Sequence, residues 1–306
     1  MAAGAAVAGV AVVTGGEPPK TPSVHPRKGS PPLALDLGVR TDPEATALRR
    51  AETLYNRGSH GAAARIFERY GSVPAQVGFA FATWPGGLAR VRELGDAHPR
   101  DAFVLLHLGL ALFWAGRNAE AVAAWRQAEQ ADPDTPSAVA ADDLLHPGFP
   151  RGLPAFVPSF SPPVSLQRLP PGRQLAALAR AAATGGARAK LLYGVTLQHL
   201  GRPVSAERWF ARAAAQAPGN AEAQVAADVG RFSKADPSLA FSDLGPLARR
   251  FPRAPTVRFH LGLLLLWLGR VNAAKTELVR AEREAPQSPI GREASRFLAQ
   301  LESIRK

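Results

Sequence analysis

The stretch LLHLGLALFWAGRNAEAVAAWRQAEQADP, residues 105–133, decides the fold of this chain of 306 residues. After Gly109 come a small alanine 12 residues later, a bulky apolar residue 16 later, another alanine 19 later and a proline 24 later. The same spacing recurs after Gly194 and after Gly262. A pattern that returns at fixed offsets predicts a stack of similar structural units.

Each unit of the pattern is expected to be a pair of closely packed helices. The glycine and the first alanine, such as Gly109 and Ala121, allow the two helices to approach each other. The bulky residues are expected to fill the space toward the next repeat; they are Trp125, Phe210 and Leu278. The prolines stop the second helix; they are Pro133, Pro218 and Pro286. Each pair leaves one apolar face unburied, so neighbouring pairs must stack.

Weaker copies of the pattern extend the stack in both directions. Residues 221–254 fit a degenerate repeat in which Asp228 replaces the glycine, and residues 44–70 and 74–100 fit two looser ones. Asp42 and Pro43 are the expected N-cap and first-turn residues of the opening helix. The sequence therefore predicts an all-α helical-repeat solenoid of about six helix pairs. Its repeats occupy residues 41–145 and 173–289, and a capping helix occupies residues 290–306.

These residues resemble the tetratricopeptide repeat family, bacterial-type, over residues 44–305. The resemblance implies that the first helices of successive repeats line a concave groove that binds a peptide or another protein. It also implies the groove-facing positions, which are Phe103, Leu106, Leu110, Phe113, Trp114, Arg188, Leu191, Val195, Gln198, His199, Thr256, Phe259, Leu263, Leu266 and Trp267. For Trp114 and Trp267, packing between repeats is the alternative role. Co-chaperone members hold a peptide's terminal carboxylate with Lys and Asn, but Leu and Phe stand here, so we do not expect that clamp.

The N-terminal residues suggest a location. Residues 2–13, AAGAAVAGVAVV, have the length of the apolar core of a signal peptide and are too short to span a bilayer alone. No Lys or Arg precedes them. We interpret residues 1–16 as a membrane anchor or export signal and the proline-rich residues 17–40 as a tether. The alternative is a disordered alanine-rich tail on a cytoplasmic protein.

A proline-rich insertion at residues 146–172 separates the two groups of repeats. Its core, HPGFPRGLPAFVPSFSPP at residues 146–163, contains too many prolines to be helical. Its apolar residues are Phe149, Phe156, Val157 and Phe160. Two interpretations are open at this point: a surface loop with its aromatic rings against the nearest repeat, or an extended segment lying in the protein's own groove.

Charge and composition narrow the function classes. The formal net charge of +12 is spread over the helices without a block of like charges, which favours a solvated basic exterior. Binding of nucleic acid is the alternative to a protein partner. The absence of cysteine excludes disulfides and thiolate metal sites.

No residue pattern indicates catalysis. The seven histidines form no HExxH motif or close ligand pair, and Asp142 and Asp143 are adjacent, so they point apart on a helix. His107 and His260 occupy equivalent repeat positions, which argues for a recurrent structural use. We therefore expect a non-enzymatic protein without cofactor or metal, whose partner is a protein or peptide.

Overall fold

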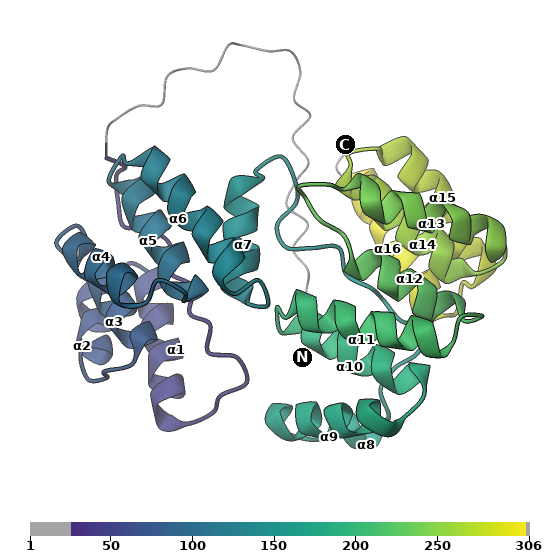
Figure 1. Cartoon of the computed structure of the whole chain (residues 1–306), viewed down its shortest axis with the longest axis horizontal. Coiled ribbons are helices and arrows are strands. Elements are labelled where there is room, and N and C mark those ends of the chain that lie inside the picture. The colour runs from purple at the N-terminus through teal and green to yellow at the C-terminus, as the bar shows by residue number, and fades with distance from the viewer. Residues whose placement is uncertain (1–25, 304–306) are drawn as a thin grey trace, which may run out of the picture. The chain divides into compact units, whose positions relative to one another are not determined.

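The computed structural model describes residues 26–303, and these form 16 α-helices without a strand (Figure 1). The expected all-α fold of about six helix pairs with a C-terminal capping helix is confirmed. Residues 1–25, which include the apolar run at residues 2–13, lie outside the described part of the chain, as do residues 304–306.

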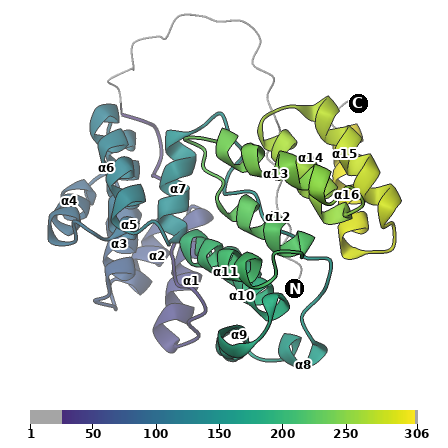
Figure 2. The same ribbon diagram turned by 45° about the vertical axis from the view of Figure 1, so that its right-hand side comes forward.

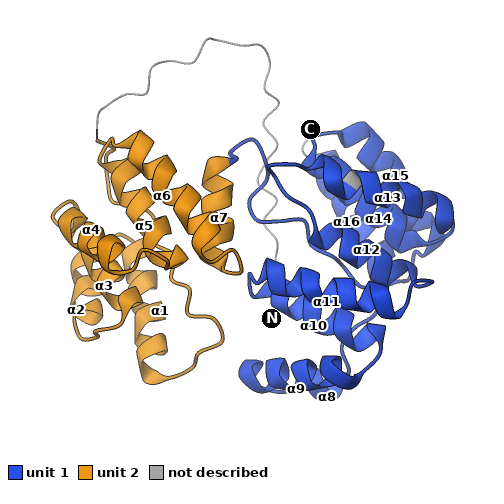
Figure 3. Cartoon of the chain, in the orientation of Figure 1, with its two compact units in different colours: residues 1–13, 146–306 blue, residues 14–145 orange. Residues whose placement is uncertain are grey.

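The helices divide into two compact units (Figure 3). Among the described residues, unit 2 covers 26–145 and unit 1 covers 146–303. Unit 2 contains α1 (Pro43–Asn56), α2 (His60–Phe67), α3 (Val73–Ala82), α4 (Leu88–Ala97), α5 (Ala102–Trp114), α6 (Asn118–Ala131) and α7 (Pro136–Leu145). Unit 1 contains α8 (Val164–Gln167), α9 (Pro171–Thr184), α10 (Ala187–His199), α11 (Pro203–Gln216), α12 (Ala221–Gly230), α13 (Ser238–Arg250), α14 (Pro255–Trp267), α15 (Val271–Glu284) and α16 (Pro289–Ser303).

Each unit contains three consecutive helix pairs. In unit 2 the first helices of the pairs are α1, α3 and α5, and each packs on the helix that follows it. In unit 1 the pairs are α10/α11, α12/α13 and α14/α15, which follow one another in Figures 1 and 2. A terminal helix closes each set, because α7 packs on α6 and α16 packs on α15. The insertion therefore marks the boundary between two three-pair units.

The glycine of each strong repeat lies against the bulky residue of its own second helix. A Cβ atom added at Gly109 would come within 2.3 Å of Trp125, and one at Gly194 within 2.4 Å of Phe210. We expect these large side chains to fill the space toward the next repeat, and Trp125 and Phe210 also fill the space beside the glycine of their own repeat. The glycine is needed because the ring itself occupies the place of a side chain. Phe210 also reaches the next repeat, where a Cβ atom added at Gly230 would come within 3.1 Å of its ring.

The ends of the helices follow the predicted signals. The second helices α6, α11 and α15 end two residues before Pro133, Pro218 and Pro286. The turn that follows a first helix uses a glycine with positive φ at Gly58, Gly116, Gly201 and Gly269.

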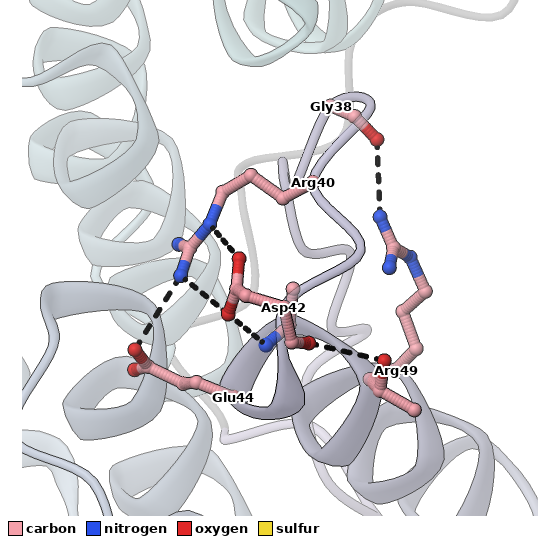
Figure 4. Close-up of polar contacts among 7 residues, drawn as sticks. Gly38, Arg40, Asp42, Glu44 and Arg49 are labelled. Carbon is pink, nitrogen blue, oxygen red and sulfur yellow. Dashed lines mark hydrogen bonds and ion pairs between the residues drawn. The ribbon is translucent and has the colours of Figure 1, made fainter. Parts of the chain in front are cut away.

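Asp42 caps α1 as predicted, with its carboxylate accepting the backbone N–H of Ala45 at 2.9 Å (Figure 4). The Arg40 guanidinium donates to the same carboxylate, at 2.8 Å from Nε to Oδ2, and holds the pKa of Asp42 down at about 2. Arg49 donates to the backbone oxygen of Gly38. The turn that leads into α1 is therefore held by hydrogen bonds on both sides of the cap.

The last pair and terminal helix of the two units correspond at one constant sequence offset. Val104, His107, Gly109, Trp114, Arg117, Ala121 and Pro136 in unit 2 match Val257, His260, Gly262, Trp267, Arg270, Ala274 and Pro289 in unit 1. Even the cap before the terminal helix is shared. Thr135 Oγ1 accepts the N–H of Ala138 at 3.1 Å, and Ser288 Oγ accepts the N–H of Gly291 at 3.0 Å.

Candidate functional site

An extended part of the insertion lies across the first helices of unit 1. We call residues 153–160 the strap. Its backbone is hydrogen-bonded to side chains of α10, α12 and α14, which are Gln198, Glu222 and His260. Figure 1 shows this coil running toward α8 past the helices of unit 1. Of the two interpretations of the insertion, the surface loop is wrong for the strap.

Gln198 on α10 holds the strap by both ends of its side-chain amide. Oε1 accepts the N–H of Phe156 at 3.2 Å, and Nε2 donates to the carbonyl oxygen of Pro154 at 3.1 Å. The amide thus pairs with the strap as the backbone of a neighbouring β-strand would. On α12, Glu222 Oε1 accepts the N–H of Ser159 at 2.6 Å, a short bond because the acceptor is a carboxylate.

His260 on α14 supplies the third contact. Its Nε2 lies 2.9 Å from the backbone nitrogen of Val157, while Nδ1 lies 2.7 Å from the carbonyl oxygen of Thr256. Because a backbone N–H can only donate, Nε2 must be the unprotonated nitrogen and Nδ1 must donate to Thr256. Burial lowers the pKa of His260 to about 4, so the neutral ring required for this arrangement is present at neutral pH.

Phe156 anchors the strap with its side chain. It is 1% exposed and lies between the ring of Phe210, in an edge contact with centroids 5.5 Å apart, and the stacked ring of His260 at 5.1 Å. Phe160 lies under the guanidinium of Arg188, whose carbon is 4.4 Å from the ring centre. One deep aromatic contact, with α11 and α14, and one shallow contact, with α10, therefore fix the strap.

The groove-facing positions implied for unit 1 fall into two sets. Arg188 and Gln198 contact the strap directly, and Leu191 belongs to the same apolar cluster as Phe156. The other positions serve other contacts. Phe259 and Leu263 are buried, His199 is exposed, and Trp267 packs edge-on against Phe232.

Sequence reasoning missed Glu222 and His260 as strap contacts. Glu222 lies in the degenerate repeat, six residues before Asp228, which is the spacing of Arg188 from Gly194, so a count from Asp228 would have found it. The signal for His260 was its recurrence at the position of His107, which we interpreted as structural. That interpretation holds for Nδ1 in both residues, but Nε2 of His260 has a second role.

A second extended segment, residues 27–38, packs within unit 2. The Arg27 guanidinium lies 3.3 Å from the ring centre of Phe113 and donates to the carbonyl oxygen of Phe113, and its backbone N–H donates to Trp114. Farther along, the side chains of Tyr55 and Glu52 on α1 bond the backbone of residues 31 and 35. Leu33 and Leu37 are buried in the core of unit 2.

This packing corrects the expected tether at residues 17–40. Residues 27–38 are not a free linker, and residues 17–25 lie outside the described part of the chain. Of the positions implied for the groove of unit 2, Phe103, Leu106 and Leu110 are buried, and the backbone oxygens of Phe113 and Trp114 accept hydrogen bonds from Arg27.

His107 is the counterpart of His260 in unit 2, and it differs at one atom. Its Nδ1 lies 2.7 Å from the carbonyl oxygen of Phe103, and burial lowers its pKa to about 4. Its Nε2 is buried and has no hydrogen-bond partner among the described residues. The same helical position thus carries an acceptor that is used in unit 1 and unused in unit 2.

Asp228 occupies the glycine position of the degenerate repeat in a buried setting. Its carboxylate accepts a bond from Arg231 at 2.6 Å, and the same guanidinium also reaches Asp243 on α13. Burial raises the pKa of Asp228 to about 6, and Arg231 only partly opposes this. The pair joins α12 to α13 where the strong repeats use a glycine contact.

Two further features bear on function. Within residues 26–303 no helix is long and apolar enough to cross a bilayer. Over the same range, no group of three His, Asp or Glu side chains is placed so that it could hold a metal ion.

Comparison with known proteins supports the repeat assignment. Residues 103–135 match the tetratricopeptide repeat family. Among solved structures, the chain is similar to one in the crystal structure of the APC/C hetero-tetramer Cut9-Hcn1, with 13% sequence identity and a TM-score of 0.29. That alignment covers 82% of this chain and 55% of the other, so it spans about half the length of that protein. Among the curated proteins no sequence matches this chain.

Proposed function

We propose that the protein is a non-enzymatic scaffold that binds a protein or peptide partner on the first helices of its units. The observation that carries this proposal is the strap, because it is an extended peptide already held there through its backbone. The tetratricopeptide repeat at residues 103–135 supports the same role, since proteins of that family generally bind other proteins.

We propose that only some of the groove positions contact the partner directly. Arg188 and Gln198 would act at the strap in unit 1, and Phe113 and Trp114 would act beside Arg27 in unit 2. The buried residues Phe103, Leu106, Leu110, Leu191, Phe259 and Leu263 would support the binding face from beneath. Burial removes these side chains from direct contact with a partner.

We also propose that residues 1–16 attach the scaffold to a membrane or direct its export. The support is their apolar composition and the proline-rich residues that follow. Expression of the full chain should place it in membranes that retain it after a carbonate wash. Recovery of the whole protein in the soluble fraction would reject the anchor and leave the scaffold untouched.

The scaffold is tested by site-specific photo-crosslinking in the full chain. A photoreactive residue at His199, exposed on the first helix α10, should form adducts with a protein partner. A matched residue at Arg212, exposed on the second helix α11, should form few. Equal labelling from both positions would contradict binding on the first helices. An adduct that nuclease removes, weakened steeply by salt, would assign the face to nucleic acid instead.

A further inference from the structure

The polar contacts of the strap all involve its backbone. The atoms that Gln198, His260 and Glu222 bind are the N–H groups of Phe156, Val157 and Ser159 and the carbonyl of Pro154. Every extended peptide offers such groups at this spacing. These three side chains therefore recognise a backbone conformation, and they leave the choice of sequence to other contacts.

The sequence of the strap is read at two aromatic positions. The ring of Phe156 is buried between Phe210 and His260, and the ring of Phe160 lies under Arg188. Between and before them stand Pro154 and Pro158, which have no N–H to leave unpaired and which favour an extended backbone. A peptide that reproduces the strap needs these features and no charged side chain.

We propose that the first helices of unit 1 recognise an extended, proline-spaced peptide with the pattern Pro-x-Phe-x-Pro-x-Phe, and that the strap occupies this site as an internal ligand. The proposal rests on the scaffold function proposed above and names the chemistry of the partner. The partner presents such a segment, and the strap must leave before that segment can bind.

Competition with the strap sets the strength of binding in the intact chain. The strap is joined covalently to unit 1 through α8, so its effective concentration at the site is on the order of millimolar. A free peptide can bind only the fraction of molecules whose strap has left the site. Its apparent affinity is the intrinsic affinity multiplied by that fraction. Weakening the strap should therefore tighten binding of the same peptide supplied from outside.

The test uses a fluorescent synthetic peptide of residues 152–161 and the full chain. Phe156→Ala in the chain removes the main anchor of the strap and empties the space of its ring. We expect the peptide to bind this variant at least about tenfold more tightly than the wild-type chain, through the effective-concentration argument. A peptide with Phe156→Ala is the control and should lose this binding. A folded variant that binds both peptides alike would overturn the proposal.

A second measurement needs no variant and covers the case in which Phe156→Ala does not fold. Amide exchange of Phe156 and Val157 is followed in the wild-type chain with millimolar peptide. Release of the strap should speed their exchange severalfold, whereas the control peptide should leave it unchanged. Unchanged exchange with both peptides would also overturn the proposal. If crosslinking at His199 still captures a protein in that case, the scaffold function survives and only this ligand class is rejected.

Discussion

The two units carry the same last repeat but use it differently. In unit 1, Nε2 of His260 accepts a hydrogen bond from the strap, whereas in unit 2 the matching atom of His107 has no partner in the described chain. Both rings are buried and both bond the carbonyl four residues earlier. The helices therefore provide a common acceptor, and the extended segment of each unit decides whether that acceptor is used.

The extended segments also differ in how they are anchored. The strap inserts one phenylalanine and spreads its hydrogen bonds over three first helices. The segment at residues 27–38 uses Leu33 and Leu37, the exposed Arg27 and polar contacts from α1. The first arrangement resembles a bound peptide, because most of its contacts are to the backbone. The second resembles a part of the core that continues directly into α1.

Among the changes that test how the two segments are anchored, removal of the ring of Phe156 should have the largest effect on stability. The ring is fully buried among aromatic neighbours, so Phe156→Ala should destabilise unit 1 by about 3–5 kcal/mol. Phe160→Ala, which removes a partly buried ring, is the matched control and should cost clearly less. Denaturant unfolding of the full chain measures both. Equal losses for the two variants would mean that Phe156 is not the anchor.

Releasing the strap should make the pKa values of His260 and His107 differ. In the intact chain both have a pKa of about 4, below the ordinary value of about 6.5, because both are buried. Replacing residues 154–160 by a Gly/Ser segment of equal length should expose His260 and raise its pKa toward 6.5. His107 should keep its low pKa. Proton NMR titration of the two rings checks this, and parallel behaviour of both rings would contradict a strap-specific role for His260.

The lowered pKa values of His107 and His260 also determine how the free energy of unfolding changes with pH. Between pH 4 and 6.5 the unfolded chain binds protons that the buried rings do not. The stabilisation by neutral histidines is therefore complete above about pH 6.5 and is lost as the pH falls toward 4. The raised pKa of Asp228 acts oppositely, costing stability as the pH rises from about 4 through 6. The difference between the wild-type chain and the Gly/Ser variant isolates the contribution of His260, at most about 3 kcal/mol.

Adding a methyl group at the repeat glycine should destabilise the two units to different extents. Gly109→Ala in unit 2 places a Cβ 2.3 Å from Trp125, while Gly262→Ala in unit 1 places one 2.9 Å from the more flexible Leu278. We expect losses of about 1–3 kcal/mol, with Gly109→Ala at the higher end. Gly61→Ala on α2, where nothing lies within 4 Å, is the control and should be neutral or stabilising. Thermal unfolding would refute the close-contact account if all three variants melted alike.

The smallest effect is expected at the start of the extended segment in unit 2. Arg27→Ala removes an exposed cation–π contact with Phe113, worth about 0.5–1 kcal/mol. Lys28→Ala removes a neighbouring charge for which no contact is described and should change little. Limited proteolysis near residue 30 measures the local effect. Identical cleavage of the two variants would show that Arg27 does not hold this segment.

The sequence predicted the helices better than the extended segments, for a physical reason. Helix pairing is encoded locally, by residues such as Gly109 and Trp125 whose spacing can be read directly. The strap depends on contacts between residues far apart in the chain, such as Phe156 with Gln198 and Val157 with His260. A proline-rich segment shows no period that would predict its partners, so its sequence alone is compatible with both interpretations.

The candidate site shows the same division. Arg188 and Gln198 were placed by counting from Gly194, and both contact the strap. Glu222 stands six residues before Asp228, as Arg188 stands before Gly194, but the groove positions were counted only in the repeats that keep the glycine. In unit 2, counting from Gly109 pointed to residues that are mostly buried, since the positions that face a groove in one repeat can face the core in another.

Amide hydrogen exchange along residues 151–160 tests most directly whether unit 1 holds its own strap as a bound peptide. We predict slow exchange at Phe156, Val157 and Ser159, whose N–H groups are bonded to Gln198, His260 and Glu222. The amides of Arg151 and Ala155, for which no such bond is described, should exchange much faster. Uniformly fast exchange across these residues would show a loose surface loop and contradict the account.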